Sequence, residues 1–135
     1  MGFNLPVIIH PSAIVSPSAL IDYGSVVFAN AVINASSTLG LGCIVNTGAI
    51  VEHDCIIDLG VHIAPSATLA GNVSVGEYSW VGIGATIVQG KIIAAGVTVG
   101  AGSVVLENVP ANVKVAGVPA KIINAKQFET NNPNR

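Results

Sequence analysis

The sequence is poor in charged and aromatic residues, which make up 9% and 4% of its 135 residues. With five Lys and Arg residues and a net charge of −2, it lacks the basic surface that nucleic acids bind, so they are excluded as partners. Gly or polar residues break every apolar stretch before the roughly 18 residues that a membrane-spanning helix needs. The first residues lack the basic and apolar regions of a signal peptide, so the expected location is the cytoplasm.

Aliphatic residues are abundant, and they recur with a period of six. Ile, Val or Leu occupies every sixth position from Ile9 to Val105. Four places after each lies a small residue such as Ala31 or Ser37, with Lys91 as the misfit. The third place after each aliphatic is rich in Gly, Asn and Asp, which tolerate left-handed backbone angles in tight turns. Each hexad therefore predicts a short strand followed by a corner.

Three hexads close a triangular coil of 18 residues, and such coils stack about 4.8 Å apart through parallel strand pairing. The sequence thus predicts an all-β fold, a parallel β-helix over residues 9–109. Residues 1–8 are expected to lead into it, residues 110–126 to cap it with a strand and turn, and residues 127–135 to be a disordered tail. Cys43 and Cys55 fall on inward positions and are expected to be buried free thiols.

His53 is a departure that the repeat does not require. It follows Val51 by two places, which puts its side chain on an outward corner between the small residues Ala35 and Gly71 of the stacked coils. Asp54 follows directly and can hold one ring nitrogen, which leaves the other free to accept a proton. A lone histidine is more often surface or core filler, so the base and its orienting acid are a hypothesis at this point.

His62 is expected to face outward between Ile44 and Trp80 of the stacked coils. One side of the coil spans about 15 Å, so His53 and His62 of one chain would not share a substrate. They can meet across a subunit boundary, and the apolar residues beside His62 favour closed self-association. The nine-residue gap between them does not fit a zinc site of histidines, and no metal is expected.

The segments VNTGAIVEHDC, VHIAPSATLAGNV, SWVGIGATI and GVPAK resemble one family when taken in order. They are similar to the β-helix domain of the sialic acid O-acetyltransferases and nucleotide-amino-sugar N-acetyltransferases, including the enzymes of bacillosamine synthesis. The resemblance covers residues 6–123 and is most specific at EHDC, at the second His nine residues on, and at AGNV. It implies a left-handed helix, a homotrimer with active sites between subunits, and acetyl-CoA as co-substrate.

The resemblance also implies residue roles. His53 is the general base and Asp54 its orienting partner, in a direct attack of a sugar amine or hydroxyl on the acetyl thioester. His62 is implied to contact the thioester region, and the backbone amide of Gly71 to face the thioester oxygen. Asn46 is a weaker candidate for contacting the acceptor, a sugar or nucleotide-sugar. The implied groove for pantetheine and the CoA phosphates consists of Gly82, Ile83, Gly100, Ala101 and Lys121.

The sequence departs from the family at its beginning. Family members usually carry an N-terminal nucleotide-binding domain, whereas this sequence starts almost at the first coil. The expectation is either a short enzyme or a fragment, and in both cases the acceptor and the choice between N- and O-acetylation stay open. The alternative function is a non-catalytic trimerisation or scaffold module that lacks its nucleotide-binding domain. An ice-binding face is not expected, because Thr68 and Thr86 make no regular threonine ladder.

Overall fold

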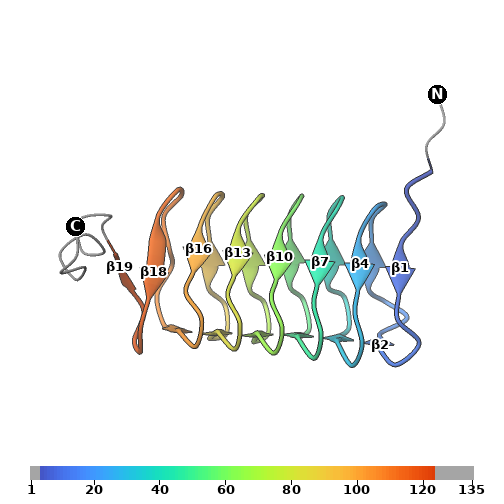
Figure 1. The fold of residues 1–135 in the computed structure, drawn as a ribbon, viewed down its shortest axis with the longest axis horizontal. Coiled ribbons are helices and arrows are strands. Elements are labelled where there is room, and N and C mark those ends of the chain that lie inside the picture. The colour runs from blue at the N-terminus through green and yellow to red at the C-terminus, as the bar shows by residue number, and fades with distance from the viewer. Residues whose placement is uncertain (1–3, 124–135) are drawn as a thin grey trace, which may run out of the picture.

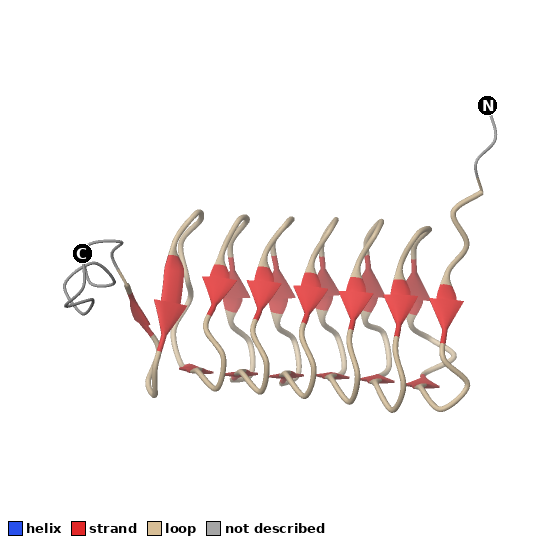
Figure 2. Ribbon diagram, in the orientation of Figure 1, coloured by secondary structure: helices blue, strands red, loops and turns tan. Residues whose placement is uncertain are grey.

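The computed structural model describes residues 4–123, which form one β-solenoid of the left-handed type with about six coils. The coils stack along the long axis of Figure 1, from β1 at the N-terminal end to β18 at the C-terminal end. This confirms the all-β solenoid, while the predicted trimer stays a prediction. Residues 4–123 contain strands, turns and loops but no helix (Figure 2), and so none with the length and apolarity of a membrane span.

Three sheets form the three sides of the coil. Sheet A contains β1 (Ile8–Ile9), β4 (Val26–Val27), β7 (Ile44–Val45), β10 (His62–Ile63), β13 (Trp80–Val81), β16 (Thr98–Val99), β18 (Lys114–Ala116) and β19 (Lys121–Ile122). Sheet B contains β2 (Ile14–Val15), β5 (Val32–Ile33), β8 (Ile50–Val51), β11 (Thr68–Leu69), β14 (Thr86–Ile87) and β17 (Val104–Val105). Sheet C contains β3 (Leu20–Ile21), β6 (Thr38–Leu39), β9 (Ile56–Ile57), β12 (Ser74–Val75) and β15 (Ile92–Ile93).

The strands pair in parallel with partners 18 residues apart, so that Ile8 lies opposite Val26 and His62 opposite Trp80. This is the predicted register. The exceptions lie at the C-terminal end of sheet A. There β18 pairs in parallel with β16 but with Thr98 opposite Lys114, 16 residues on, and β19 turns back and pairs antiparallel with β18. The predicted tail of residues 127–135 lies outside the described residues, as do the last positions of the predicted cap.

The predicted aliphatic ladder is the core. From Val27 to Val105 its side chains point inward and are almost fully buried. The first three rungs differ, because Ile9 is 43% exposed and Val15 and Ile21 are only partly buried. These rungs lie at the N-terminal end of the stack, and no other coil of residues 4–123 packs beneath them. The repeat therefore extends further than the buried core does.

The corners have the left-handed backbone that the sequence predicts. The third residue after each aliphatic has a positive φ from Gly24 to Gly102. Tyr78 is an unexpected residue for this position, with φ 57°. Its ring lies over Gly60 of the neighbouring coil, where a Cβ would come within 2.7 Å of two ring carbons. Gly60 thus provides both the turn and the space for the Tyr78 ring.

Buried hydroxyl and thiol groups connect successive coils. Ser79 donates to the carbonyl of Ala94 at 2.9 Å and accepts the amide N–H of Val97 at 3.1 Å. Ser25 and Ser37 bond in the same pattern. The inward thiols follow it in part: Cys43 Sγ lies 3.0 Å and Cys55 Sγ 3.3 Å from a backbone carbonyl oxygen. Both cysteines are buried and free, as predicted, and burial raises the pKa of each thiol.

Candidate active site

The backbone of two neighbouring coils holds His53 at an outward corner. His53 follows β8, whose residue Val51 is fully buried and anchors the chain. The amide of Asp54 donates to the carbonyl of Ala35 at 2.9 Å, and the carbonyl of His53 accepts the amide N–H of Asn72 at 2.8 Å. The imidazole is therefore carried by a rigid turn, as its position in the repeat predicts.

Asp54 contacts one nitrogen of the imidazole. The distance from His53 Nδ1 to Asp54 Oδ2 is 2.9 Å. An ionised carboxylate can only accept, so this contact assigns the hydrogen of the neutral ring to Nδ1 and leaves a lone pair on Nε2. The two side chains are 53% and 60% exposed, so the pair orients the ring but contributes little to stability.

The Nε2 edge of the His53 ring lies over Gly71 of the next coil. A Cβ on residue 71 would come within 2.5 Å of both Cε1 and Nε2 of the imidazole. The repeat does not require glycine at this position. Gly71 is the only glycine among the residues two places after a ladder aliphatic, and Ala35 and Ala95 occupy equivalent positions in their hexads. Glycine at 71 is thus explained by the His53 ring.

The backbone amide of Gly71 is a free donor beside that ring. Across residues 4–123, no acceptor bonds to it. At three equivalent corners the amide is bonded by the side chain of the preceding residue, which is Asp22, Asn46 or Asp58. Ala70 precedes Gly71 and has no such oxygen. A lone pair and an unbonded N–H therefore lie close together at this corner.

His62 lies on sheet A, between Ile44 and Trp80, as predicted. Its ring centroid is 4.1 Å from a ring of Trp80, with the planes tilted by 52°. Nε2 of His62 lies 3.2 Å from Nδ2 of Asn46. Burial lowers the pKa of His62 below its ordinary value of 6.5. The neutral form of His62 is therefore favoured at neutral pH.

The predicted pantetheine residues form two columns at the corner after sheet A. Gly82 and Gly100 follow Asn46 in one column, while Ile83 and Ala101 share the next. A Cβ on Gly82 would lie 2.5 Å from the carbonyl oxygen of Val99, and one on Gly100 would lie 2.9 Å from Ala116 Cβ. Close packing of the next coil is thus enough to explain both glycines. Ile83 is 60% exposed and provides an apolar surface.

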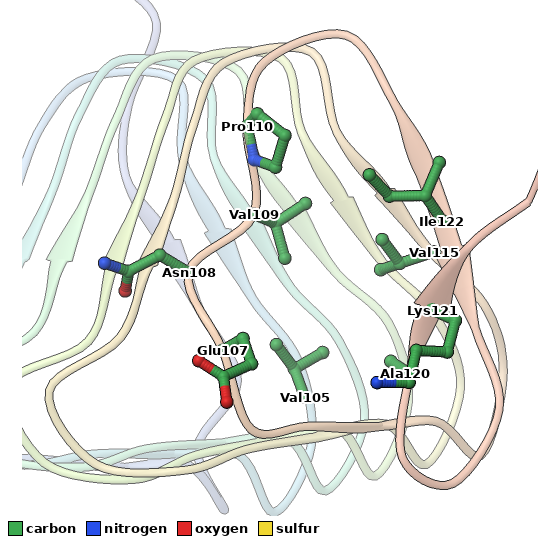
Figure 3. Close-up of a pocket in the computed structure, with 9 residues that line it drawn as sticks. All are labelled: Val105, Glu107, Asn108, Val109, Pro110, Val115, Ala120, Lys121 and Ile122. Atoms are coloured by element: carbon green, nitrogen blue, oxygen red, sulfur yellow. The ribbon is translucent and has the colours of Figure 1, made fainter.

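Lys121 lies on β19 at the C-terminal end of sheet A, and it lines a pocket of about 410 Å³. Figure 3 shows the pocket between the segment of Glu107 to Pro110 and the β18–β19 hairpin. The core residue Val105 of β17 also lines it. This pocket is several coils away from His53, and none of the residues of the histidine corner lines it.

The predicted residues therefore fall into two groups. The first group contains His53, Asp54 and Gly71, at the corner between sheets B and C. The second group lies on sheet A and the corner that follows it, and consists of Asn46, His62, Gly82, Ile83, Gly100, Ala101 and Lys121. Sheet B separates the two corners by about 15 Å. One chain does not bring them together.

Sequence reasoning missed two neighbours of the second group. The 18-residue register places Trp80 beside His62 but indicates no part for it in the site, although it packs on the imidazole. The repeat gives no signal for Thr47, yet its amide N–H donates to Asn46 Oδ1 at 2.8 Å. Stacking by 18 residues could have indicated Trp80, whereas side-chain rotamers decide the Thr47 contact. Within residues 4–123, no three His, Cys, Asp or Glu side chains gather as a metal site would need.

Comparison with solved structures finds close matches to acetyltransferases. The acetyltransferase domain of PglB from Neisseria gonorrhoeae is 53% identical with a TM-score of 0.90, over 90% of this chain and 60% of that chain. PerB from Caulobacter crescentus, solved in complex with CoA and GDP-perosamine, is 48% identical with a TM-score of 0.90, over 91% of this chain and 59% of that one.

Sequence comparison agrees with the structural match. A 2,3,4,5-tetrahydropyridine-2,6-dicarboxylate N-acetyltransferase from Clostridium perfringens is 38% identical in an alignment of 78 residues that covers 52% of this chain and 33% of the relative. The chain thus spans about a third of that relative and three fifths of the two solved structures. No protein-family model matches the sequence.

Proposed function

Because residues 4–123 form a β-helix of the hexapeptide-repeat acetyltransferase family, we propose that this chain transfers an acetyl group from acetyl-CoA to the amine of a nucleotide-linked sugar. The observation that carries the proposal is the corner of His53, Asp54 and Gly71, where a base, its orienting acid and a free amide meet. The neighbour with CoA and GDP-perosamine supports the substrate class. A sugar hydroxyl is the alternative acceptor.

The proposed reaction is a direct transfer. The acceptor nitrogen attacks the thioester carbonyl while Nε2 of His53 takes a proton from it, and Asp54 stabilises the imidazolium through Nδ1. The carbonyl oxygen becomes an oxyanion, which the amide of Gly71 stabilises. The C–S bond then breaks, and the CoA sulfur leaves with the proton from His53. A C–N bond has replaced a C–S bond, and no acyl-enzyme forms.

The complete site is proposed to lie between subunits of a homotrimer. One subunit would provide His53, Asp54 and Gly71, and its neighbour would provide His62 and the columns of Gly82 and Gly100. The columns run along the stacking direction towards the end of the helix that carries Lys121. An extended pantetheine arm fits this direction, with the CoA phosphates near the Lys121 ammonium. Asn46 then lies beside His62 and not beside the general base His53.

The experiment is an acetyl transfer assay of the full chain with His53→Ala. Release of the CoA thiol is followed with a panel of amino-sugar nucleotides and with sialic acid. We expect one acceptor class to be used, and a loss of 10²-fold or more in kcat for the variant, which is about the contribution of a positioned base. His10→Ala is the matched control, because His10 is also exposed and bonded to a nearby side chain, Ser12.

The outcomes separate enzyme from scaffold. Unchanged turnover of His53→Ala with the accepted substrate would show that His53 is not the base. Calorimetry of the full chain with acetyl-CoA addresses the scaffold alternative, since a scaffold binds none and is indifferent to substitution of Lys121. Binding without turnover of any acceptor would assign the acceptor site to protein outside this sequence.

A further inference from the structure

The orientation of the Asn46 amide is determined by Thr47. The backbone N–H of Thr47 lies 2.8 Å and its hydroxyl 3.3 Å from one terminal atom of Asn46. A backbone N–H can only donate, so that atom is the carbonyl oxygen Oδ1. The other terminal atom is therefore the NH₂ nitrogen, and it points to His62 at 3.2 Å.

This orientation assigns the tautomer of His62. An amide NH₂ group can only donate, so Nε2 of His62 accepts and carries no hydrogen. The neutral ring then carries its hydrogen on Nδ1. Packing on Trp80 at 4.1 Å restrains the ring plane, and desolvation disfavours the doubly protonated form. Within residues 4–123, no acceptor bonds to Nδ1 of His62.

We propose that Asn46 is a positioning residue that holds His62 in the neutral Nδ1–H form, so that His62 acts as a hydrogen-bond donor and not as a second base. This rests on the proposed acetyl transfer, in which His62 lies beside the acetyl donor. The two histidines then expose opposite hydrogen-bonding groups, an acceptor at His53 and a donor at His62. His53 exposes the lone pair of Nε2 and its Nδ1 is bonded to Asp54, whereas the lone pair of His62 is occupied by Asn46.

The two histidines therefore have different chemical roles in the proposed site. The Nδ1–H of His62 suits an acceptor atom such as the thioester carbonyl oxygen, and it has no lone pair to offer to the sugar amine. Loss of the Asn46 amide frees Nε2, and the ring then exchanges between two tautomers. Asn46→Asp has a stronger effect, because a carboxylate next to Nε2 attracts the hydrogen to that nitrogen. Neither change touches His53 or its partner Asp54.

The first test is nitrogen NMR of the imidazoles in the full chain without ligand. We expect Nε2 of His62 to resonate as an unprotonated nitrogen and Nδ1 as a protonated one. Asn46→Ala should average the two signals, and Asn46→Asp should move the hydrogen to Nε2. A wild-type His62 with its hydrogen on Nε2 would overturn the proposal. This readout needs no turnover, so it stands apart from the proposed acetyl transfer.

The second test is kinetic. We expect Asn46→Ala to lower kcat/KM for acetyl-CoA about tenfold, the scale of one lost hydrogen bond, and to have no further effect in a His62→Phe background. Asp22→Ala is the matched control, because Asp22 caps the next amide as Asn46 does, with no histidine beside it. Equal losses in Asn46→Ala and Asp22→Ala, or a full loss that persists in His62→Phe, would refute the positioning role.

Discussion

At the scale of single residues, Gly71 shows how one missing Cβ connects two coils. The ring of His53 occupies the space where a side chain at 71 would begin. The φ of Gly71 is not in the left-handed region, and alanine occupies the equivalent hexad positions at 35 and 95. The glycine is therefore required by the neighbouring imidazole, while the backbone conformation itself accepts any residue.

Gly71→Ala is expected to lower kcat about 10²-fold, because the new methyl group displaces the imidazole from the amide. The thermal unfolding midpoint should stay close to that of the wild type. Gly82→Ala is the contrasting variant: its Cβ would meet the carbonyl oxygen of Val99 at 2.5 Å, so it should lower the midpoint. The measurements are steady-state kinetics and thermal melting. Wild-type kcat in Gly71→Ala would show that the ring position does not matter.

Side-chain contacts set the limit of what the sequence could predict about the site. The corner positions of His53 and Gly71 followed from counting in sixes, because the repeat has no insertions. The bond from Asn46 to His62 did not follow, since it crosses from one coil to the next along a diagonal and depends on an amide turned by Thr47. Such a contact is decided by rotamers, which the period does not encode.

At the scale of strands and coils, two-residue strands have few hydrogen bonds of their own, and buried side chains add to them. Ser25, Ser37 and Ser79 each bridge a carbonyl and an amide of successive coils. The sequence indicated only that this position is small, because Ala fits the same space. The hydroxyl ladder was therefore not predicted, although the Ser residues were visible in the repeat.

Ser79→Ala is expected to reduce the free energy of unfolding by about 1 kcal/mol, since it removes the two hydrogen bonds of the buried bridge and leaves the Val97 amide to bond the Ala94 carbonyl directly, as equivalent amides do above an inward Ala. Ser79→Cys should cost less, because Cys43 and Cys55 make one of these bonds at equivalent places. Urea unfolding measures both. Ser74→Ala, on the outward face of β12, is the control. Equal losses in Ser79→Ala and Ser74→Ala would show that the buried bridge adds no stability.

The terminal coils show a second feature that the six-residue period does not predict. The hexad ladder begins at Ile9, but its first rungs are exposed or only partly buried because no coil of the described residues lies below them. A period describes the interior of a solenoid well and its ends poorly. At the other end, the β18–β19 hairpin departs from parallel stacking. The sequence predicted the capping strand and turn there, without the antiparallel pairing.

At the scale of the whole molecule, the two groups of site residues lie at different corners of one prism. The outward face of sheet A also carries exposed apolar side chains, among them Ile8 at 56% and Trp80 at 49%. An apolar face beside half of a site is suited to contact with a second copy that brings the other half. Self-association would therefore complete the site and cover this face together.

Mixing two variants, each impaired in a different half of the proposed site, tests whether the site is shared between subunits. In the proposed trimer, His53→Ala damages the group at the corner after sheet B, and His62→Phe damages the group on sheet A. When equal amounts are dissociated and reassembled together, about one quarter of the interfaces combine an intact His53 from one subunit with an intact His62 from its neighbour. Activity should then recover to about a quarter of the wild-type value, although each variant alone has little.

Reassembly of each variant with itself is the control, and native mass spectrometry of differently tagged chains confirms that mixed trimers form. Mixed trimers without any recovery of activity would place both histidines in one subunit's site. A fully active His62→Phe would remove that residue from catalysis and leave the corner of His53 to work alone. Recovery near a quarter requires that sheet A of one copy contacts the His53 corner of another. Within one chain, the width of sheet B keeps the two halves of the site apart.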